Sequence, residues 1–558
     1  MPALTKTDRW VLVGILCFAA LVHFGRIGAS INGVHLTTDP AMYASISAAY
    51  GHPEAFAEDF VYSNPAMFST HITPLVQLTH FLVGADGNYG LAYLHLTGLS
   101  VFLHYAAFYL LGIVLFSQRW KALVFTTLMG LSYWVPWGTY WGAGYLDYTP
   151  RSLFNALYAL YLCVGLALLR RPRWWPLFMV ATGLLVYIHS ISALAAAAGL
   201  WLSFAASRPE GVSWPRHLVW MFFCGCCFLA TLLPYAAVYL HSSGISLGKD
   251  DIAFMRHILR TRFDIEYAEY WYGMKKFLKQ YTLLPVLPLA GWGTWMIWKY
   301  GTPREKLLGK HIWLWIAGTC VVIALFILDQ QIARIWERHH FEFDLIRVHR
   351  FFPFFAICLI FLGANILLRK FSEPGWKRNA ARVFYAGLVI GFFCGGQQDM
   401  ARVSFEWYWN RLDPARYEAA YGPQLRRLEM VEALKSRTKP GETIFYPGED
   451  QAIRYISLRP LTYGWKDACL MYYAKALPEL RLWSHMETAL VASPTAYIAE
   501  GLATSPDYLL SERPQDRDLL ETQVGPVIWE NSRYVLVKNM HKKSADTSPR
   551  RPPASSAP

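Results

Sequence analysis

Long apolar runs fill most of the chain from Trp10 to Gln397. A helix needs about 20 mostly apolar residues to cross the hydrocarbon core of a bilayer. About eleven runs approach that length, with short charged loops between them: 10–29, 91–116, 122–141, 152–169, 174–188, 190–207, 218–240, 281–298, 311–329, 351–368 and 383–397. Of the 558 residues, 54% are hydrophobic and only 16% are charged, which is too apolar for an ordinary soluble surface. The sequence therefore predicts a mainly α, polytopic transmembrane bundle.

Basic residues fix the predicted orientation of this bundle. Lys and Arg cluster in short loops on one predicted side, whereas none lies between Arg26 and Arg119. Cytoplasmic loops carry such an excess, so we predict the N-terminus inside and the C-terminus outside. The same rule explains the net charge of +13 without a nucleic-acid partner. It does not explain the basic residues of two long outer loops, 241–280 and 330–350.

Residues 174–207 must cross the membrane twice if both of their basic flanks are cytoplasmic. The polar break from Tyr187 to Ser190 leaves little room for an exposed loop. A tight hairpin or a re-entrant pair is expected there, and one very long helix is not.

After Gln397 the pattern becomes that of a water-soluble domain. Helical periodicity at 421–436 is followed by strand-like segments at 442–446, 508–510, 526–529 and 534–537. The predicted division is a membrane domain over 1–397, a small extracytoplasmic α/β domain over 398–541 and a disordered Ser/Pro/Ala-rich tail over 542–558.

Asp39 is the most informative polar residue, because it lies just past the outer end of the first span. Pro40 follows it, so Asp39 could simply cap a helix that begins there. The functional alternative is a general base that takes a proton from an acceptor group above the bilayer. Both readings stay open, since one carboxylate can serve both.

Several short motifs resemble a known class of membrane enzyme. They are Asp39 with Tyr43 after the first span, Thr149-Pro150-Arg151 at the start of a later span, a span closing at His189, and, in the outer domain, Arg454 to Pro460 followed by Trp465-Lys466-Asp467. With the predicted inside N-terminus and outside C-terminus, they resemble GT-C glycosyltransferases, in particular bacterial protein-mannosyltransferase and lipid-A aminoarabinose-transferase proteins. In this chain the acidic pair of that class is Asp39 followed by Pro40.

The resemblance implies a multi-pass protein of a cell membrane, the inner membrane of a bacterium. It would transfer a sugar, with inversion, from a polyprenyl-phosphate-linked donor to a glycan, lipid or protein acceptor outside. Asp39 would be the base, with Asp59 and Asp147 as further candidate carboxylates. The candidates for binding the donor phosphate are Arg151, Arg347, Arg350 and Lys249, since cations stabilise a departing phosphate.

Further site candidates are Tyr43, His189 and His349. His189 breaks an apolar stretch at membrane depth, where polar groups usually have partners. His349 belongs to a cluster with ligand chemistry, made of His339, His340, Glu342, Asp344 and His349. Its spacing matches no ligand pattern, so no cofactor is established and a divalent metal ion stays open.

Two other functions remain as alternatives. A non-catalytic partner in a glycan assembly complex would keep the fold without a second carboxylate beside Asp39. A transporter of lipid-linked glycans would be expected to show inverted repeats and charged residues deep inside its spans.

Overall fold

The computed structural model describes the chain except for residues 1–3, 72, 85–86, 136–138, 146–148, 244–246, 264–285, 339–342, 398, 450, 493–495 and 543–558. The chain divides into two compact units. The helical unit comprises residues 1–44 and 69–420, and the C-terminal unit comprises residues 45–68 and 421–558. The predicted tail therefore falls almost wholly outside the described residues.

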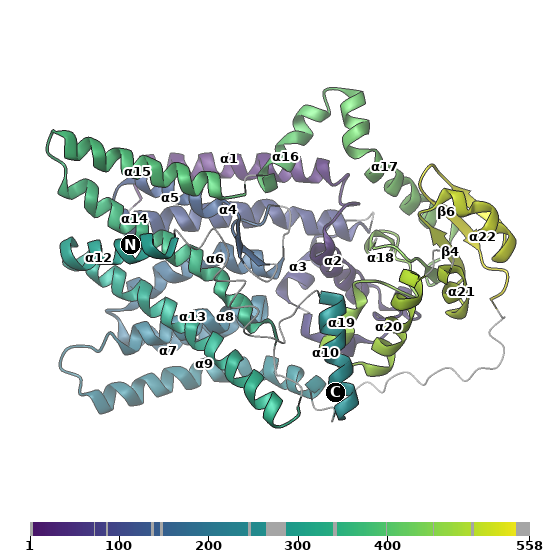
Figure 1. Ribbon diagram of the computed structural model, residues 1–558, viewed down its shortest axis with the longest axis horizontal. Coiled ribbons are helices and arrows are strands. Elements are labelled where there is room, and N and C mark those ends of the chain that lie inside the picture. The colour runs from purple at the N-terminus through teal and green to yellow at the C-terminus, as the bar shows by residue number, and fades with distance from the viewer. Residues whose placement is uncertain are drawn as a thin grey trace. The chain divides into compact units, whose positions relative to one another are not determined.

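The helical unit is a bundle of long helices that run side by side (Figure 1). A helix lies at each predicted span: α1 (Lys6–Ala29), α4 (Tyr89–Phe116), α5 (Arg119–Gly130), α6 (Pro150–Leu168), α7 (Trp175–Leu184), α8 (Val186–Ala205), α9 (Trp214–Ser243), α12 (Val286–Tyr300), α13 (Pro303–Ile335), α14 (Phe351–Lys370) and α15 (Trp376–Gly395). The mainly helical fold predicted from the apolar runs is confirmed.

Among the described residues, seven helices are long and apolar enough to cross a membrane. They are Lys6–Ala29, Tyr89–Phe116, Pro150–Leu168, Val186–Ala205, Trp214–Val238, Pro303–Ile335 and Leu345–Lys370. By length and composition, the chain is thus a multi-pass helical membrane protein. The count of about eleven spans stays a prediction.

The predicted span over 122–141 is wrong in its extent. Helix α5 ends at Gly130, and a short antiparallel hairpin follows, with β1 (Tyr133–Val135) paired to β2 (Thr139–Trp141). A Cβ atom at Gly130 would lie 2.1 Å from the hydroxyl of Tyr105, so the chain passes close to α4 at this point. One apolar run in the sequence therefore holds two kinds of element.

Residues 174–207 form a helical hairpin, and their predicted double crossing of the membrane stays a prediction. The hydroxyl of Tyr161 in α6 donates to the carbonyl of Ala196 and accepts from Thr182, at 3.2 and 3.3 Å. These partners lie seven residues on either side of His189. The two limbs, α7 and α8, therefore lie beside one another, as the tight-hairpin prediction requires.

Charged side chains at helix ends pair with one another. The buried carboxylate of Asp8 in α1 accepts from Arg119 of α5 and from the hydroxyl of Tyr109 in α4, each at 2.8 Å. Glu305 of α13 pairs with Arg369 of α14 at 2.7 Å. Pairing lowers the cost of placing these charges against the apolar bundle.

Glycines allow the closest helix crossings. A Cβ atom at Gly363 of α14 would lie 2.6 Å from the Cα of Gly293 in α12, and one at Gly318 of α13 would lie 2.2 Å from the backbone nitrogen of Gly199 in α8. Small residues at such points let helix backbones meet, which is typical of packing inside membranes.

The helical unit continues past the predicted boundary at residue 397. Helix α16 (Asp399–Asn410) packs along α1, where a Cβ atom at Gly25 would lie 2.0 Å from the carbonyl oxygen of Ser404. The hydroxyl of Tyr408 donates to the carbonyl of Leu21 at 2.9 Å. Because this helix is amphipathic rather than uniformly apolar, hydropathy alone assigned it to the outer domain.

The remaining elements of the helical unit belong to the segments between spans. They are α3 (Pro74–Leu82), α10 (Lys249–Phe263) and the 3-10 helices η3 (Ser69–His71), η4 (Pro172–Trp174) and η6 (Phe343–Arg350). Helix α2 (Thr38–Gly51) begins in this unit, and α17 (Pro414–Arg437) ends in the C-terminal unit.

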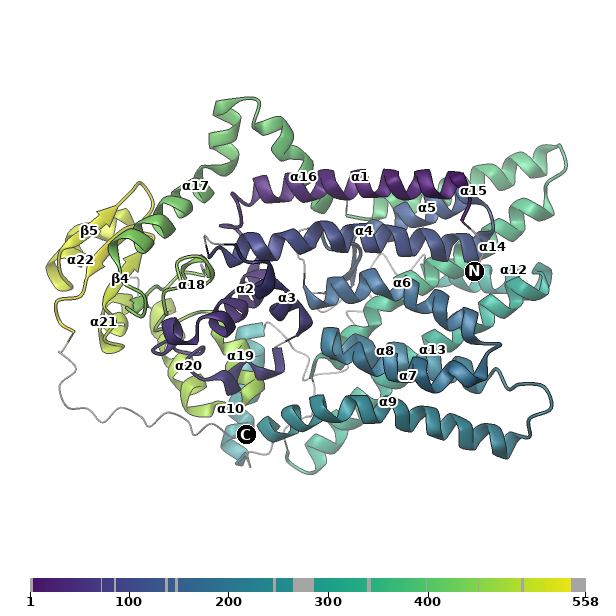
Figure 2. The same ribbon diagram turned by 180° about the vertical axis from the view of Figure 1, so that it is seen from behind.

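The C-terminal unit is built on a four-stranded sheet of order β3-β4-β6-β5. The strands are β3 (Ile444–Phe445), β4 (Tyr508–Ser511), β5 (Val527–Glu530) and β6 (Val535–Lys538); β3 pairs parallel with β4, and the other pairs are antiparallel. Helices α17, α21 (Ala496–Ala503) and α22 (Arg517–Gln523) lie beside the sheet (Figure 2). The unit also contains α18 (Ala452–Tyr455), α19 (Asp467–Ala474), α20 (Leu477–Ala492) and η7 (Pro514–Asp516). The predicted α/β character is confirmed.

Residues 45–68, which lie between the predicted spans 10–29 and 91–116, belong to this unit, with η1 (Pro53–Phe56) and η2 (Pro65–Met67). The backbone N–H of Phe60 donates to the carbonyl of Leu461 at 2.9 Å. The predicted division at a single point in the sequence therefore differs from the observed one, in which two distant segments share one core.

Two glycines of α12 provide a matched test of the helix packing. Replacing Gly293 with Ala places a Cβ atom 2.4 Å from the carbonyl oxygen of Leu359. We expect this variant to lose about 1–3 kcal/mol of stability, because the backbones must separate. Gly291→Ala meets nothing within 4 Å and is expected to be neutral or slightly stabilising. Thermal unfolding of both variants in nanodiscs measures the difference, and equal midpoints would contradict the close crossing.

Candidate functional site

A kink in α8 forms one side of the candidate site. His189 has extended backbone angles, φ −155° and ψ 100°, inside an otherwise helical segment. Its ring nitrogen Nδ1 accepts a hydrogen bond from the backbone N–H of Ser192 at 3.3 Å. The imidazole therefore caps the second half of α8, and the break predicted at Tyr187 to Ser190 is confirmed.

The second side is η6, which leads directly into α14. Arg350 is almost wholly buried, with 1% of its surface exposed, and donates to the hydroxyl of Ser192 in α8. His349 is buried as well, and its Nδ1 lies 2.6 Å from the carbonyl of Ile346. Arg347, one turn earlier, is half-buried. The segment 347–350 thus brings two guanidinium groups to the kinked end of α8.

The third side is the start of α6. Thr149 caps this helix by accepting from the backbone N–H of Ser152 at 3.3 Å, and Pro150 occupies the first turn. Arg151 follows, with only 8% of its surface exposed. Its guanidinium carbon lies 5.3 Å from the ring centre of Tyr140 in β2. The cap and the aromatic contact together orient this cation.

These three segments lie close together. Arg350 bonds Ser192 of α8, and the ring of Phe351, the next residue, has its centre 6.3 Å from that of Phe154 in α6 and 5.8 Å from that of Trp141 in β2. Arg151, His189, Arg347 and Arg350 come from these segments. We call these four residues the arginine cluster. Each guanidinium group carries a permanent positive charge, which an anionic group can neutralise at short range. Arg suits phosphate because its planar fork donates two parallel hydrogen bonds.

The structure places the predicted base in a different segment. Asp39 is half-buried in the first turn of α2, where a negative charge is favourable for the helix dipole. It is not the capping residue, since the N–H of Ala41 donates to the carbonyl of Thr37 and the helix begins at Thr38. Tyr43 lies one turn further on, and its ring centre is 6.4 Å from that of His71.

Lys249 and Asp147 are the two remaining predicted site residues. Lys249 begins α10 and pairs with Glu337 at 2.5 Å, with both side chains exposed. A surface pair of this kind does not by itself indicate a phosphate site. Asp147 lies outside the described residues.

The structure describes only two residues of the candidate metal-ligand cluster, Asp344 and His349. His339, His340 and Glu342 of the predicted cluster lie outside the described residues. In the part of the chain that the structure describes, no group of three His, Cys, Asp or Glu side chains is arranged to hold a metal.

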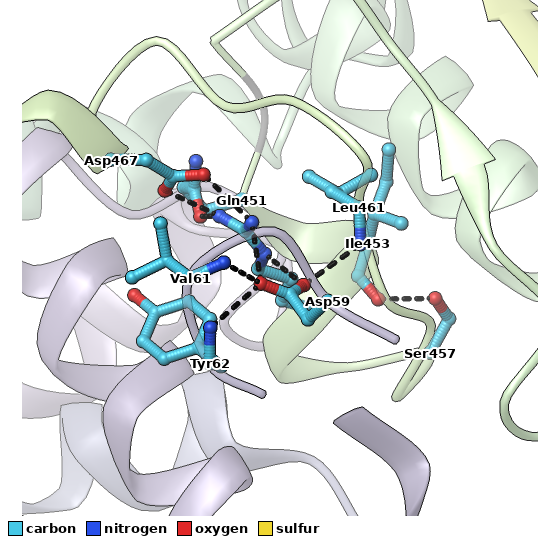
Figure 3. Close-up of polar contacts among 9 residues, drawn as sticks. Asp59, Val61, Tyr62, Gln451, Ile453, Ser457, Leu461 and Asp467 are labelled. Atoms are coloured by element: carbon cyan, nitrogen blue, oxygen red, sulfur yellow. Dashed lines mark hydrogen bonds and ion pairs between the residues drawn. The ribbon is translucent and has the colours of Figure 1, made fainter. Parts of the chain in front are cut away.

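Asp59 belongs to the C-terminal unit, where it is wholly engaged in structural contacts (Figure 3). Its Oδ1 accepts from the backbone N–H groups of Val61 and Tyr62, each at 3.0 Å, and its Oδ2 accepts from that of Leu461 at 2.8 Å. Arg454 donates to both oxygens, at 2.8 and 2.9 Å. The side chain of Asp59 is 0% exposed, so this geometry favours a structural role for Asp59 over the predicted catalytic one.

Arg454 also binds the carboxylate of Asp467, at 2.7 and 2.8 Å. We call Asp59, Arg454 and Asp467 the buried clamp. Burial opposes the charged form of Arg454, but the two carboxylates outweigh it and raise the pKa of the guanidinium. The ring of Tyr62 lies 4.8 Å from that guanidinium, and burial raises the pKa of its hydroxyl well above the usual value. Arg454 therefore stays charged at any physiological pH.

The motif from Arg454 to Pro460 has a second structural arginine. Leu458 adopts a left-handed backbone conformation with φ 54°, and the chain turns there. Arg459 then donates to the carbonyls of Thr438 and Ser457, at 2.7 and 2.6 Å. The motif quoted from the sequence is thus a scaffold of the C-terminal unit, and its pairing with Asp59 was not predicted.

The chain matches no protein-family model and no curated protein. Among solved structures it is similar to ArnT from Cupriavidus metallidurans, which was determined with undecaprenyl phosphate bound. The sequence identity is 13% and the TM-score 0.45, with 96% of this chain and 98% of that chain covered.

The buried clamp generates a test of stability. Arg454→Met leaves two buried carboxylates facing each other, and we expect a loss of about 3–5 kcal/mol. The control is Arg517→Met, which removes an exposed pair with Glu530 at 2.9 Å and should cost about 0–1 kcal/mol. Limited proteolysis of the full-length variants in rising urea reports on the C-terminal unit. Equal resistance of the two variants would contradict the clamp.

Proposed function

We propose that this protein is an integral-membrane glycosyltransferase that uses a polyprenyl-phosphate-linked sugar as donor. The observation that carries the proposal is the arginine cluster: Arg350 is buried against Ser192 of the kinked helix α8, Arg347 lies one turn before it, and Arg151 opens α6, whose Phe154 packs on Phe351 at 6.3 Å. Concentrated guanidinium charge at the ends of apolar helices suits a ligand that joins a phosphate to a long hydrocarbon chain. The phosphate would bind the guanidinium groups, and the chain would lie along the bundle.

The reaction follows from the chemistry of such a donor. An acceptor hydroxyl oxygen attacks the anomeric carbon of the sugar, and the bond between that carbon and the phosphate oxygen breaks. The bonding electrons leave with the polyprenyl phosphate, whose charge the arginine cluster stabilises. Attack opposite the departing phosphate inverts the configuration at the anomeric carbon.

The proton of the acceptor needs a base, and Asp39 is our candidate. It stands at the start of α2, directly after the first span, and its half-buried carboxylate keeps contact with solvent. Tyr43 belongs to the same helix, and its ring centre lies 6.4 Å from that of His71. Both residues are candidates for positioning the acceptor. A base in this place would act with the donor phosphate bound at the membrane surface.

The orientation completes the proposal. The basic loops between the spans favour an inside N-terminus, so we place the reaction and the C-terminal unit on the extracytoplasmic face of a cell membrane, the inner membrane in a bacterium. The acceptor is then a glycan, a lipid or a protein outside the cytoplasm.

Binding of the donor phosphate is tested at Arg350. We expect Arg350→Met and Arg347→Met to weaken binding of undecaprenyl phosphate in nanodiscs by roughly tenfold or more, because each loses a charge-assisted hydrogen bond. The control is Lys249→Gln, whose exposed cation already pairs with Glu337, and its affinity should stay within about twofold of wild type. Native mass spectrometry measures the bound lipid. Wild-type affinity in both arginine variants would exclude the proposed phosphate site.

Transfer is tested at Asp39. Asp39→Asn keeps the size of the side chain and removes the base, so the rate of glycan product formation should fall by roughly 100- to 10,000-fold while lipid binding is retained. Glu54→Gln, an exposed carboxylate that lies 3.5 Å from His52, is the control and should keep the wild-type rate. An unchanged rate for Asp39→Asn rules out its role as base. Lipid binding by the wild type without any turnover would favour the non-catalytic partner instead.

A further inference from the structure

A cavity of about 290 Å³ lies within the C-terminal unit. It is open on one side, and its volume is at the lower end of the range for small-molecule sites, about 300–1,000 Å³. Its lining residues come from four segments: Glu58, Phe60, Thr462, Leu482, Met486, Glu500, Ala503 and Thr504.

The buried clamp fixes one wall of this cavity. Asp59 points inward to Arg454, while its neighbours Glu58 and Phe60 line the cavity. The backbone of Leu461 bonds Asp59 through its N–H and Phe60 through its carbonyl, at 2.8 and 2.9 Å. Thr462 follows Leu461 directly. The clamp thus holds Phe60 and Thr462 in place on two backbone segments that are joined by hydrogen bonds.

Helices α20 and α21 form the opposite wall. Leu482 and Met486 are four residues apart on one face of α20, with Met486 buried and Leu482 at the rim. Glu500, Ala503 and Thr504 share one face at the end of α21. The hydroxyl of Thr504 donates to that of Thr462 at 2.9 Å and so joins the two walls.

The chemistry of the lining selects among ligands. The polar side chains of these eight described residues are two carboxylates and two hydroxyls, and none of the eight is basic. The two carboxylates therefore disfavour phosphates and other anions, and the exposed His485, whose Nε2 lies 3.6 Å from Oε1 of Glu500, stands outside the lining. A ligand must instead offer several hydrogen-bond donors to carboxylate oxygens and an apolar face to Phe60, Leu482 and Met486. A pyranose ring has both, in its hydroxyl groups and its C–H faces.

We propose that this cavity binds a single neutral sugar residue, such as one unit of a glycan chain. Glu58 and Glu500 accept from its hydroxyls in charge-assisted hydrogen bonds, and Phe60 packs against its ring. The inference goes beyond the proposed transferase, because the cavity lies in the C-terminal unit and its use requires neither the donor lipid nor Asp39.

The test is direct binding to the full-length protein in nanodiscs, without donor lipid. Saturation-transfer difference NMR is run with the methyl glycosides of glucose, galactose, mannose and N-acetylglucosamine, each titrated separately. For an open cavity of this size we expect saturable binding of at least one, with a Kd on the order of 1 mM. Glu58→Gln and Glu500→Gln should each weaken it by roughly tenfold, and Phe60→Leu should reduce transfer to the ring protons.

The control is Glu521→Gln, an exposed carboxylate on α22 outside the lining, which should leave the affinity unchanged. Hexylammonium is titrated in parallel as a cationic probe. Three results would each overturn the proposal: no saturable sugar binding, equal binding by the Glu58, Glu500 and Phe60 variants, or binding of hexylammonium alone. Failure of this test leaves the effects of Arg350→Met and Asp39→Asn unaffected, so the two proposals are judged separately.

Discussion

The bilayer's lack of hydrogen-bond partners for the backbone governs most of this structure. Each span must satisfy its own N–H and C=O groups, which only a helix does within one segment. Helices so constrained then pack through small residues, and the contacts at Gly293 with Gly363 and at Gly199 with Gly318 are the result. The exception at His189 is informative, because an imidazole supplies the acceptor that the interrupted helix lacks. The irregular backbone is thereby tolerated beside the arginine cluster.

Charge is handled in two different ways along the chain. In the helical unit, Arg151 and Arg350 are buried and Arg347 is half-buried, and we propose these three residues as ligands of an anionic group. In the C-terminal unit, Arg454 is held between Asp59 and Asp467, where donors and acceptors match fully. The proposed role of the first arrangement is binding. The second suits specification of a fold, since removing Arg454 leaves two buried carboxylates without their counter-charge.

Much of the fold follows from periodicity, because the length of an apolar run reports directly on a spanning helix. The break at His189 was also readable, since polar residues interrupt an apolar stretch there. The hairpin after Gly130 was not, because its residues are as apolar as those of a span. The boundary at 397 failed for the opposite reason, as α16 is amphipathic yet packs on α1. Of the site, Arg151, Arg347, Arg350 and His189 were singled out by type and position. The pairing of Asp59 with Arg454 could not be predicted, because the local sequence around each residue carries no information about a partner 395 residues away.

That separation has a consequence for how the protein is made. Asp59 and Arg454 are 395 residues apart, and the Asp59 segment completes its core only with the last quarter of the chain. At about 5–20 residues per second, synthesis needs roughly 20–80 s to reach Arg454 after Asp59 emerges. During that interval a carboxylate and several apolar side chains of residues 45–68 lack their final neighbours. Any agent that captures exposed segments during membrane insertion has that long to act on them, and a slower ribosome lengthens the exposure in proportion.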